Sequence, residues 1–582
     1  MKSFTTVIPF IKKHKLSYIT GIIFLIAVDL LQLIIPHLLG SLTDLFKSKD
    51  LTPKVLLNYA GLVIGIALLV FLFRFIWRVM IMGMSRLLEQ DMRNAFFDKL
   101  LTLSPQYYNE HKTGDLMAHA TNDINAVRMA VGPGVIMSVD AAFLGLSIIV
   151  IMLLTIDIRL TILALIPLPI IALVVTRFGK VIHSRFLKVQ EAFSSLTDKV
   201  QESISGIRVI KAFVQEEDEI KNFKQENTNN LKANMNMIRI WGLFDPTVQL
   251  LAALSFTIAL LVGGVQVING IISLGNFVAF VSYLGMLIWP MMASGWVINI
   301  FERGSASMER LNVIFNVTSD INDKCADTNI TDIEGNIEIR NLTFSYKKEL
   351  PPALKNININ IPKGKTLAIV GKTGSGKSTL VNLIERLYVV PQDTIFIDGH
   401  DINDIPLKTL RENIGFVPQD NFLFSDTLAN NISFFNEVPL EKIRQYAAIA
   451  DIDKDIMSFP EKYNTIVGER GVTLSGGQKQ RVSIARALIK EPKILILDDS
   501  LSAVDTNTEE TILQHLKNFM KDRTTIIVSH RISTIKNADE IIVLDDGEII
   551  ERGTHDNLIK LRGLYNSLYE KQLLEDAISH QY

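Results

Sequence analysis

Gly371-Lys372-Thr373-Gly374-Ser375-Gly376-Lys377-Ser378-Thr379 is the stretch that decides the fold of the C-terminal half of the chain. It follows the apolar run Leu367–Val370, which favours a strand, and precedes a sequence that favours a helix. A glycine-rich loop in this setting, spaced G-x-x-x-x-G-K-[ST], lets backbone N–H groups wrap nucleotide phosphates while the lysine contacts the β- and γ-phosphates and the hydroxyl binds Mg²⁺. The sequence therefore predicts a nucleotide and Mg²⁺ site. Its expected phosphate-binding residues are Gly371, Thr373, Gly374, Ser375, Gly376, Lys377, Ser378 and Thr379, with Ser378 also on the metal.

A second apolar run, Ile494–Leu497, ends in Asp498, a carboxylate placed to hold the Mg²⁺ shell. From about residue 335 onward, short β-rich runs alternate with helical stretches, and Asp398-Gly399 and Asp546-Gly547 are typical hairpin turns. This alternation predicts an α/β domain with a mainly parallel core sheet. The candidate strands are 336–346, 366–370, 394–397, 413–417, 493–497, 524–528 and 539–544.

The composition indicates one apolar part and one ordinary globular part. The chain has 582 residues, which is too many for one core, and 48 % of them are hydrophobic while 21 % are charged. The mean hydropathy is +0.26. A net charge of −2 provides no basic face, so no nucleic-acid partner is expected. Cys325 is the only cysteine, which excludes an intrachain disulfide.

The apolar part lies before residue 305 and contains six runs that are long enough to cross a bilayer. They are 18–39, 57–82, 132–154, 158–178, 243–268 and 274–300. The first continues beyond the length of a signal peptide, so we interpret it as a retained span. Lys and Arg concentrate in the N-terminus and in the two long connections, which predicts that these parts and the C-terminal half are cytoplasmic. We therefore expect a multi-pass protein of the cell membrane, in contact with the lipid bilayer.

The two long connections have helical periodicity, so the membrane helices should continue into the cytoplasm. Each connection has one break, at Leu103-Ser104-Pro105 and at Ser205-Gly206. Short amphipathic pieces follow at 105–115 and 206–216. Each piece is either a docking element for another domain or an ordinary turn.

Four charged residues lie inside the predicted spans: Asp29, Arg74, Arg78 and Asp140. Ionisable groups at this depth are costly and normally face a bundle interior or a cavity. They either contact substrate or pair between helices, for example an arginine with Asp29. The stretch Met286–Met292 is either an adaptable apolar pocket or simple helix packing.

Leu474-Ser475-Gly476-Gly477-Gln478, between the two halves of the nucleotide site, carries a family resemblance. The chain resembles an ATP-binding-cassette exporter of the bacterial type, with membrane and ATPase domains fused. The resemblance implies an all-α transmembrane domain of six helices over 1–320, a linker over 321–335, an α/β ATPase domain of the phosphate-loop type over 336–575 and a tail over 576–582. It implies that ATP and Mg²⁺ are the cofactors.

The resemblance also implies roles for single residues. Leu474, Ser475, Gly476, Gly477 and Gln478 would clamp the γ-phosphate of ATP held by the opposite subunit. Tyr346 would stack on adenine, Gln419 would touch Mg²⁺ and sense the membrane domain, and His530 would reach the γ-phosphate. Asp505 belongs to the loop Ser502–Asp505 that borders the nucleotide. Val467–Gly471 matches a segment that meets the short crosswise helices, which favours the docking interpretation of 105–115 and 206–216.

Asp499 departs from the family pattern, in which a glutamate after the Mg²⁺ aspartate is the general base. Aspartate is one methylene shorter, so its carboxylate should stop about an ångström short of the attacking water. General-base catalysis contributes about 10²- to 10⁴-fold, so this site should bind ATP and hydrolyse it slowly. The alternative is that Asp499 is a tolerated exchange in an active homodimer.

A weak base beside an unbroken signature resembles the heterodimeric bacterial multidrug exporters with one degenerate ATP site, and this resemblance implies half of an asymmetric pair. The expected partner is a second half-transporter in a heterodimer, with a homodimer as the alternative. The expected substrate is a small lipophilic or amphipathic compound, as in multidrug exporters. The alternatives are export of lipid or peptide, and a nucleotide-binding regulatory subunit that gates an active partner.

Overall fold

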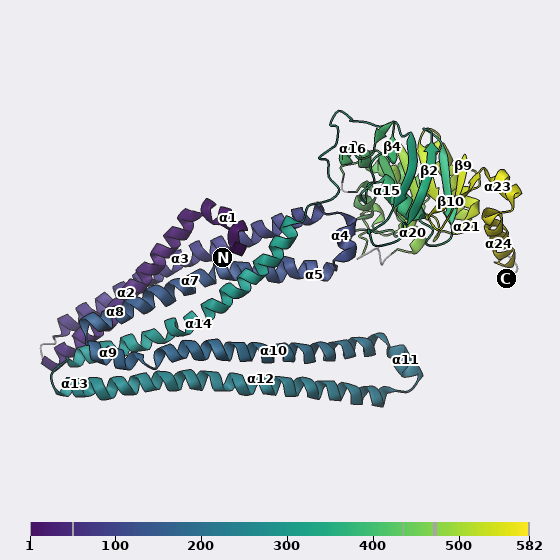
Figure 1. Cartoon of the computed structure of the whole chain (residues 1–582). Helices are drawn as coiled ribbons and strands as arrows, with labels where there is room; N and C mark the ends of the chain where they lie inside the picture. Colours follow the sequence, from purple (N-terminus) through teal and green to yellow (C-terminus); the bar gives the residue numbers. More distant parts are fainter. Residues whose placement is uncertain (1, 49–51, 435, 469–473, 580–582) are drawn as a thin grey trace. The chain divides into compact units, whose positions relative to one another are not determined.

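The computed structural model describes residues 2–48, 52–434, 436–468 and 474–579 (Figure 1). The chain divides into two compact units. The first comprises Met1–Leu101 and His111–Val317, and the second comprises Thr102–Glu110 and Thr318–Tyr582. A short piece of the first long connection therefore belongs with the C-terminal unit.

The described residues of the first unit form helices joined by short turns. Six of its helical stretches are long and apolar enough to cross a membrane, which confirms the six predicted spans. They are Lys15–Ser48, Pro53–Leu101, Thr113–Thr155, Ile158–Ser205, Glu216–Ile268 and Leu274–Asn316. The elements are η1 (Lys2–Thr6), α1 (Ile8–Lys13), α2 (Lys15–Ser48), α3 (Pro53–Leu101), α5 (Thr113–Ala118), η2 (His119–Asp123), α6 (Ile124–Val131), α7 (Pro133–Val139), η3 (Asp140–Leu144), α8 (Gly145–Thr155), α9 (Ile158–Leu165), α10 (Leu168–Ser205), α11 (Ile207–Ala212), α12 (Glu216–Ile258), η4 (Ala259–Gly263), α13 (Gly264–Ile268) and α14 (Leu274–Asn316).

The membrane helices extend past their apolar runs, as the periodicity predicts. Helices α10 and α12 run side by side, and the short helix α11 joins their ends (Figure 1). The two predicted breaks are confirmed, because α3 ends at Leu101 before α4 (Pro105–Glu110), and α10 ends at Ser205 before α11. Helices α10 and α12 thus form one long helical hairpin, with the short helix α11 at its tip.

Close packing joins α14 to α2. Gly40 and Gly275 meet there, and a Cβ on Gly40 would lie 2.6 Å from the Gly275 carbonyl oxygen. In the stretch Met286–Met292, Leu287 and Pro290 are buried. Several neighbouring methionines pack against the same core cluster as Leu287. This stretch is therefore mainly helix packing.

The second unit contains two sheets. The six-stranded sheet has the order β10-β9-β3-β8-β7-β6, and all its pairs are parallel except β9 with β10. The four-stranded sheet, β2-β1-β4-β5, is antiparallel. The strands are β1 (Ile337–Phe344), β2 (Leu354–Ile361), β3 (Thr366–Gly371), β4 (Ile395–Ile397), β5 (His400–Asp401), β6 (Ile414–Val417), β7 (Ile494–Asp498), β8 (Thr524–Val528), β9 (Glu540–Asp545) and β10 (Glu548–Gly553). The predicted parallel core sheet is confirmed.

Strand β2 is absent from the predicted strands. Its sequence, Leu-Lys-Asn-Ile-Asn-Ile-Asn-Ile, buries the leucine and the isoleucines and exposes most of the residues between them. The alternation of period two was a usable signal, but three asparagines, which are rare in strands, obscured it. Strands β5 and β10 were also missed, although the turns that precede them were predicted.

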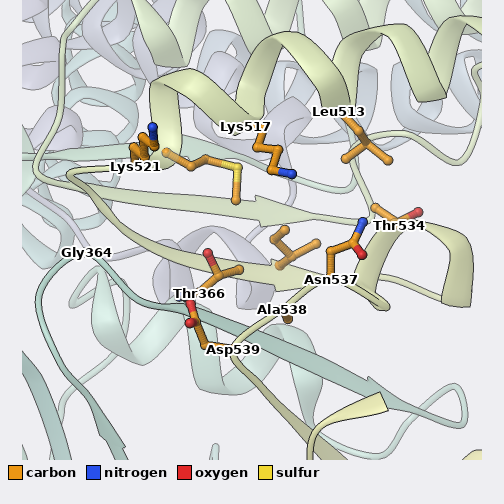
Figure 2. Close-up of a pocket in the computed structure, with 11 residues that line it drawn as sticks. Gly364, Thr366, Leu513, Lys517, Lys521, Thr534, Asn537, Ala538 and Asp539 are labelled. Carbon is orange, nitrogen blue, oxygen red and sulfur yellow. Dashed lines mark hydrogen bonds between the residues drawn. The ribbon is translucent and has the colours of Figure 1, made fainter. Parts of the chain in front are cut away.

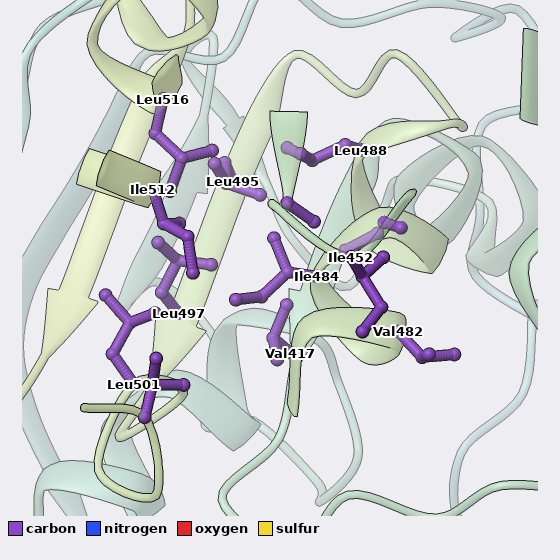
Figure 3. Close-up of a cluster of buried hydrophobic side chains, with 14 of the residues drawn as sticks. Val417, Ile452, Val482, Ile484, Leu488, Leu495, Leu497, Leu501, Ile512 and Leu516 are labelled. Carbon is purple, nitrogen blue, oxygen red and sulfur yellow. The ribbon is translucent and has the colours of Figure 1, made fainter. Parts of the chain in front are cut away.

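Helices pack on the parallel sheet and fix the positions of its strand ends. They are α15 (Lys377–Ile384), α16 (Leu407–Glu412), α17 (Leu428–Ser433), α18 (Leu440–Ile449), α19 (Asp453–Ser458), α20 (Gly476–Leu488), α21 (Thr506–Met520), α22 (Ile532–Ile535), α23 (His555–Leu561) and α24 (Leu564–Ser579). Figure 3 shows side chains from α20, such as Ile484, and from α21, such as Ile512, gathered with Leu495 and Leu497 of β7. This packing holds the carboxyl ends of β3 and β7 at one edge, where ligands bind in parallel sheets.

Candidate functional site

A pocket of about 350 Å³ lies at the carboxyl ends of β3, β7 and β8. Most of the residues predicted from the sequence to bind nucleotide or metal line this pocket, although they come from widely separated parts of the second unit. They are Tyr346, Thr373, Gly374, Gly376, Lys377, Ser378, Thr379, Gln419, Asp498, Asp499 and His530, and Ala353 and Val528 complete the wall. The structure thus brings the first half of the predicted site together with the second.

The glycine-rich loop has the backbone shape that its sequence requires. Gly374 and Gly376 have φ angles of +85° and +101°, which side chains other than glycine rarely adopt. A Cβ on Gly376 would also lie 2.7 Å from the Ala353 carbonyl oxygen. Helix α15 begins at Lys377, so its first N–H groups point into the pocket without partners of their own helix. The loop can therefore surround an anion with backbone donors.

Lys377 closes the loop. Its ammonium donates to the carbonyl oxygens of Gly371 at 2.9 Å and Lys372 at 2.8 Å. Burial lowers the pKa of Lys377, and the nearby carboxylates of Asp498 and Asp499 oppose that shift. A buried cation held in this way is ready to pair with phosphate.

Asp498 and Ser378 face each other and offer oxygen ligands of the kind that Mg²⁺ prefers. Burial raises the pKa of Asp498 and the adjacent Asp499 adds to the rise, whereas a hydrogen bond with Ser378 lowers it. Asp498 is only 4 % exposed. The donor set fits a cation that arrives with phosphate oxygens. Within the described residues, no cluster of three His, Cys, Asp or Glu side chains could hold a metal ion independently of a nucleotide.

Asp499 follows in a left-handed backbone conformation, with a φ angle of +46°. Its N–H donates to the Val528 carbonyl oxygen at 2.8 Å, which anchors the turn after β7 to the end of β8. Asp499 lines the pocket together with Asp498 and His530. Since the backbone is anchored, the short side chain cannot be brought forward by a small shift of the turn.

Tyr346 lines the pocket and forms an aromatic wall together with Phe344 and Tyr388. The Tyr346 hydroxyl hydrogen-bonds with the Thr379 Oγ1 atom at 2.8 Å, and its ring meets the Tyr388 ring edge-on at a centroid distance of 5.0 Å. Phe344 contacts both rings. Tyr388 cannot be recognised from the sequence, because it lies in a loop and its contacts are with residues that are distant in the sequence.

Helix α4 contacts this aromatic wall. The side-chain amide of Gln106 donates to the Tyr346 carbonyl oxygen at 3.4 Å, and that of Asn109 donates to the Tyr388 hydroxyl at 3.2 Å. Glu110 forms an ion pair with Lys347 at 2.9 Å. Of the predicted piece 105–115, residues 105–110 are therefore a docking element and not an ordinary turn, whereas the rest belongs to the first unit, where α5 begins at Thr113. The second piece exposes apolar side chains that include Val209 of α11 and Phe213, the residue that follows this helix.

The segment Leu474–Gln478 does not line the pocket. Ser475 caps the N-terminus of α20, since its Oγ atom accepts from the Gln478 N–H at 3.3 Å while the Gln478 side chain accepts from the Ser475 N–H at 3.0 Å. Ser475 and Gly476 are exposed, so the unpaired N–H groups of this helix end face outward. Asp505 is likewise exposed and caps α21 through the Thr508 N–H at 3.0 Å. These residues are available to a second molecule.

The remaining predicted residues, which do not line the pocket, are Gly371, Ser375 and those of the segment Val467–Gly471. Gly371 lies at the end of β3, where a Cβ would lie 2.1 Å from the Leu544 carbonyl oxygen. Ser375 is buried, and its hydroxyl has no partner among the described residues. In Val467–Gly471, Val467 is buried, and residues 469–471 lie outside the described residues.

A separate pocket of about 250 Å³ lies under α21 (Figure 2). Leu513 and Lys517 of α21 face Thr366 and Asp539 across it. Asp539 is already paired, with Lys365 at 2.9 Å. None of the predicted nucleotide or metal residues lines this pocket.

Comparison with known proteins matches both halves of the chain. Residues 18–291 match the ABC transporter transmembrane region, and residues 354–502 match the ABC transporter domain. The chain is 41 % identical over 573 residues to the multidrug resistance-like ATP-binding protein MdlA of Buchnera aphidicola subsp. Schizaphis graminum, with 98 % of each chain covered. It is 40 % identical over 569 residues to the probable multidrug resistance ABC transporter ATP-binding/permease protein YheI of Bacillus subtilis, with 98 % of this chain and 97 % of that protein covered.

Two further proteins resemble the chain over a smaller share of its length or at lower identity. The ATP-dependent lipid A-core flippase of Syntrophus aciditrophicus is 38 % identical over 492 residues, which cover 84 % of this chain and 81 % of the flippase. A solved structure of a bacterial Atm1-family ABC exporter with ATP bound has the same fold, with a TM-score of 0.77 over 97 % of this chain and 98 % of that one, at 24 % identity. The chain therefore belongs to the ABC transporter family: it is a multi-pass membrane exporter subunit whose transmembrane region and cytoplasmic ATPase domain share one polypeptide.

Proposed function

We propose that the chain is one half of a heterodimer that uses ATP to export lipophilic or amphipathic compounds across the bacterial cytoplasmic membrane, and that its own ATP site is catalytically weak. The observation that carries the proposal is the presence of Asp499 at the general-base position beside an unbroken signature, Leu474–Gln478. Asp499 weakens ATP hydrolysis at this chain's own site. The signature supports ATP hydrolysis at the partner's site.

The pocket binds ATP through its loop and its aromatic wall. The N–H groups of Gly374–Thr379 and the Lys377 ammonium hold the phosphates, and Tyr346 stacks on the adenine. Ser378, Asp498 and Gln419 hold Mg²⁺, which when bound neutralises charge that develops on the phosphates. His530 lies at the same edge and reaches the γ-phosphate. Geometry supports each assignment, because all these residues line one pocket.

Asp499 would have to orient the attacking water as general base. Its carboxylate is about an ångström short of the position that a glutamate reaches, and the bond from its N–H to the Val528 carbonyl oxygen holds the backbone in place. Binding is unaffected, because Lys377 and the loop do not depend on Asp499. We therefore expect ATP to stay bound at this site for longer than one round of hydrolysis takes at the partner's site.

The exposed capping box at Ser475 serves the other site of the pair. The free N–H groups at the start of α20 favour negative charge, and Ser475 keeps that end ordered. On this proposal they cover the γ-phosphate of ATP held by the partner subunit, whose own base is a glutamate. ATP then favours the closed pair because it adds contacts that only the closed state offers.

Closure reaches the membrane helices through the two short helices. Helix α4 contacts the aromatic wall of its own ATPase unit through Gln106 and Asn109. We assign the exposed apolar side chains of α11 to docking on the partner subunit. Helix α11 lies at the tip of the hairpin formed by α10 and α12, so a movement of a docked partner is passed to the membrane spans by two long, stiff helices.

A purified chain in lipid nanodiscs tests the proposal. Steady-state ATP hydrolysis of the chain alone should be slow, and Asp499→Glu should raise it by at least about tenfold, since a positioned base contributes 10²- to 10⁴-fold. The matched control is Asp522→Glu, which adds the same methylene at an exposed position. Rapid hydrolysis by the unaltered chain, together with no gain in Asp499→Glu, would refute the weak-site proposal.

Two alternatives rest on particular observations. The flippase similarity favours a lipid substrate, which a lipid-scrambling assay with the purified pair would detect. Asp499 itself favours a regulatory subunit that binds ATP and never hydrolyses it. In that case the chain purified alone would bind ATP without turnover, and Asp499→Glu would add none.

A further inference from the structure

The backbone turn that carries His530 is held by the C-terminal helix α24. His530 lies between β8, which ends at Val528, and the short helix α22, which begins at Ile532. The side-chain amide of Gln572 in α24 donates to the His530 carbonyl oxygen and accepts from the Ile532 N–H at 2.8 Å. The first N–H groups of a helix have no partner within it, and the residue before α22, Arg531, gives it no side-chain cap among the described residues. Gln572 therefore supplies this cap from another element.

Helix α24 is anchored in the core of the ATPase unit on the face that carries Gln572. Tyr565 is fully buried in the core cluster, and Leu568 and Tyr569 pack against the same cluster. Gln572 lies about two helical turns after Tyr565, so both side chains are on one face of α24. The packing of the helix thus sets the position of the Gln572 amide.

The residue after His530 connects the same turn to the loop before α21. The Arg531 guanidinium donates to the carbonyl oxygens of Ser502 at 3.2 Å and Val504 at 3.1 Å. It also pairs with Glu509 of α21, which is 2 % exposed. The turn is therefore held from two directions, by the loop before α21 and by the C-terminal helix.

We propose that Gln572 is a positioning residue for His530, and that its amide holds the turn so that the histidine side chain meets the γ-phosphate of ATP bound by this chain. The inference rests on the proposed function, in which His530 reaches that phosphate. His530 lines the nucleotide pocket but is exposed, so its backbone, more than side-chain packing, decides where the ring points. Since ADP lacks the γ-phosphate, the C-terminal helix contributes to the preference of this site for ATP over ADP.

Isothermal titration of the full-length chain in nanodiscs with Mg·AMP-PNP and with Mg·ADP measures this contact. AMP-PNP keeps a γ-phosphate and is not hydrolysed, so the strength of Asp499 as a base does not affect the result. Gln572→Leu removes both bonds at similar side-chain size. It should weaken AMP-PNP binding by about three- to tenfold, because a misplaced histidine loses a hydrogen bond to a charged group, while ADP binding changes by less than about twofold. The control is Gln514→Leu, which makes the same change at an exposed position in α21 and should alter neither.

His530→Ala separates this inference from the proposed function. It should weaken AMP-PNP binding by at least about tenfold and leave ADP binding unchanged. Adding Gln572→Leu to it should cause no further loss, since both changes remove the same contact.

The inference alone is overturned if His530→Ala weakens AMP-PNP binding while Gln572→Leu binds it as tightly as the unaltered chain. Equal losses of AMP-PNP and ADP affinity in Gln572→Leu would also overturn it, because they would show a general disturbance of the pocket. If His530→Ala has no effect on AMP-PNP binding, the proposed role of His530 fails together with the inference.

Discussion

The N–H of Ala503 donates to the side-chain oxygen of Gln480 at 2.9 Å, and this bond joins the signature helix to the loop that follows Asp499. The other side of the same amide donates to the Ser502 Oγ atom at 3.1 Å. Gln480 is 5 % exposed. On the proposed function, α20 contacts the nucleotide of the partner, whereas the loop after Asp499 lies near the nucleotide of this chain. The buried Gln480 side chain therefore links the two ATP sites of a pair.

Gln480→Ala removes this link. It leaves buried donors and acceptors unpaired, so we expect a loss of about 1–3 kcal/mol in the free energy of unfolding, and at least a fivefold fall in ATP hydrolysis by the purified pair. ATP affinity at the phosphate loop should stay the same, as measured by equilibrium binding of a fluorescent ATP analogue. Lys479→Ala, one residue earlier on α20, is the control. A variant that hydrolyses ATP at the normal rate would show that the link is structural only.

Tyr346 should contribute through its ring more than through its hydroxyl. Tyr346→Ala removes a base-stacking surface worth about 1–3 kcal/mol, so ATP affinity should fall by about tenfold or more. Tyr346→Phe loses only the bond to Thr379 and should lose less than about threefold. Isothermal titration with Mg·ATP separates the two variants. Equal losses in both would place the hydroxyl, and not the ring, against the nucleotide.

Asn109 and Tyr388 form the contact between α4 and the aromatic wall. Tyr388→Phe and Asn109→Ala should each lower the amount of substrate transported per ATP hydrolysed, with ATP affinity unchanged, because each removes a single bond of about 1 kcal/mol. The double variant should be no worse than either single variant, since both remove the same bond. Additive losses would mean that the two residues act separately.

Glu385 predicts a pH dependence of stability. Burial raises its pKa to about 8, although the charges of Lys490 and Arg411 act in the opposite direction. Between the ordinary glutamate pKa and 8 the folded state holds a proton that the unfolded state has lost, so stability is complete at low pH and declines as the pH rises toward 8. Over the whole range from the ordinary glutamate pKa to 8, the decline in the free energy of unfolding should amount to at most about 5 kcal/mol. Thermal unfolding at pH 5.5 and 8.5 measures it, and Glu385→Gln should flatten the difference. An equal difference in that variant would assign the effect to another group.

The sequence predicts those parts of this molecule that have a regular pattern within a short stretch of chain. Six apolar runs give the spans, and the order of strand, glycine-rich loop and helix gives the phosphate site, because both signals are local. Strand β2 is missed because its asparagines dilute the alternation of isoleucines. Tyr388 and Gln480 are missed because their importance depends on partners far away in the chain, Asn109 and Ala503, which only the folded structure brings near.

The charged residues in the spans show the same limit. Sequence alone places Asp29, Arg74, Arg78 and Asp140 at membrane depth, and helix periodicity puts the two arginines on one face. It does not show that Arg78 is occupied by Trp77 or that Asp140 lies close enough to Asp29 to interact with it. These contacts are a property of the packed helices.

The central claim is that this chain lends its signature to a partner's working site while its own site is weak. The most direct measurement is steady-state ATP hydrolysis by the complex purified from its native membrane through a tag on this chain. Ser475→Asp keeps the helix cap but sets a negative charge against the partner's γ-phosphate, so it should lower hydrolysis by at least about tenfold. Asp499→Ala should leave hydrolysis within about twofold, since general-base catalysis worth about 10²- to 10⁴-fold would come from the partner. Near-complete loss in Asp499→Ala, or normal hydrolysis in Ser475→Asp, would contradict the account.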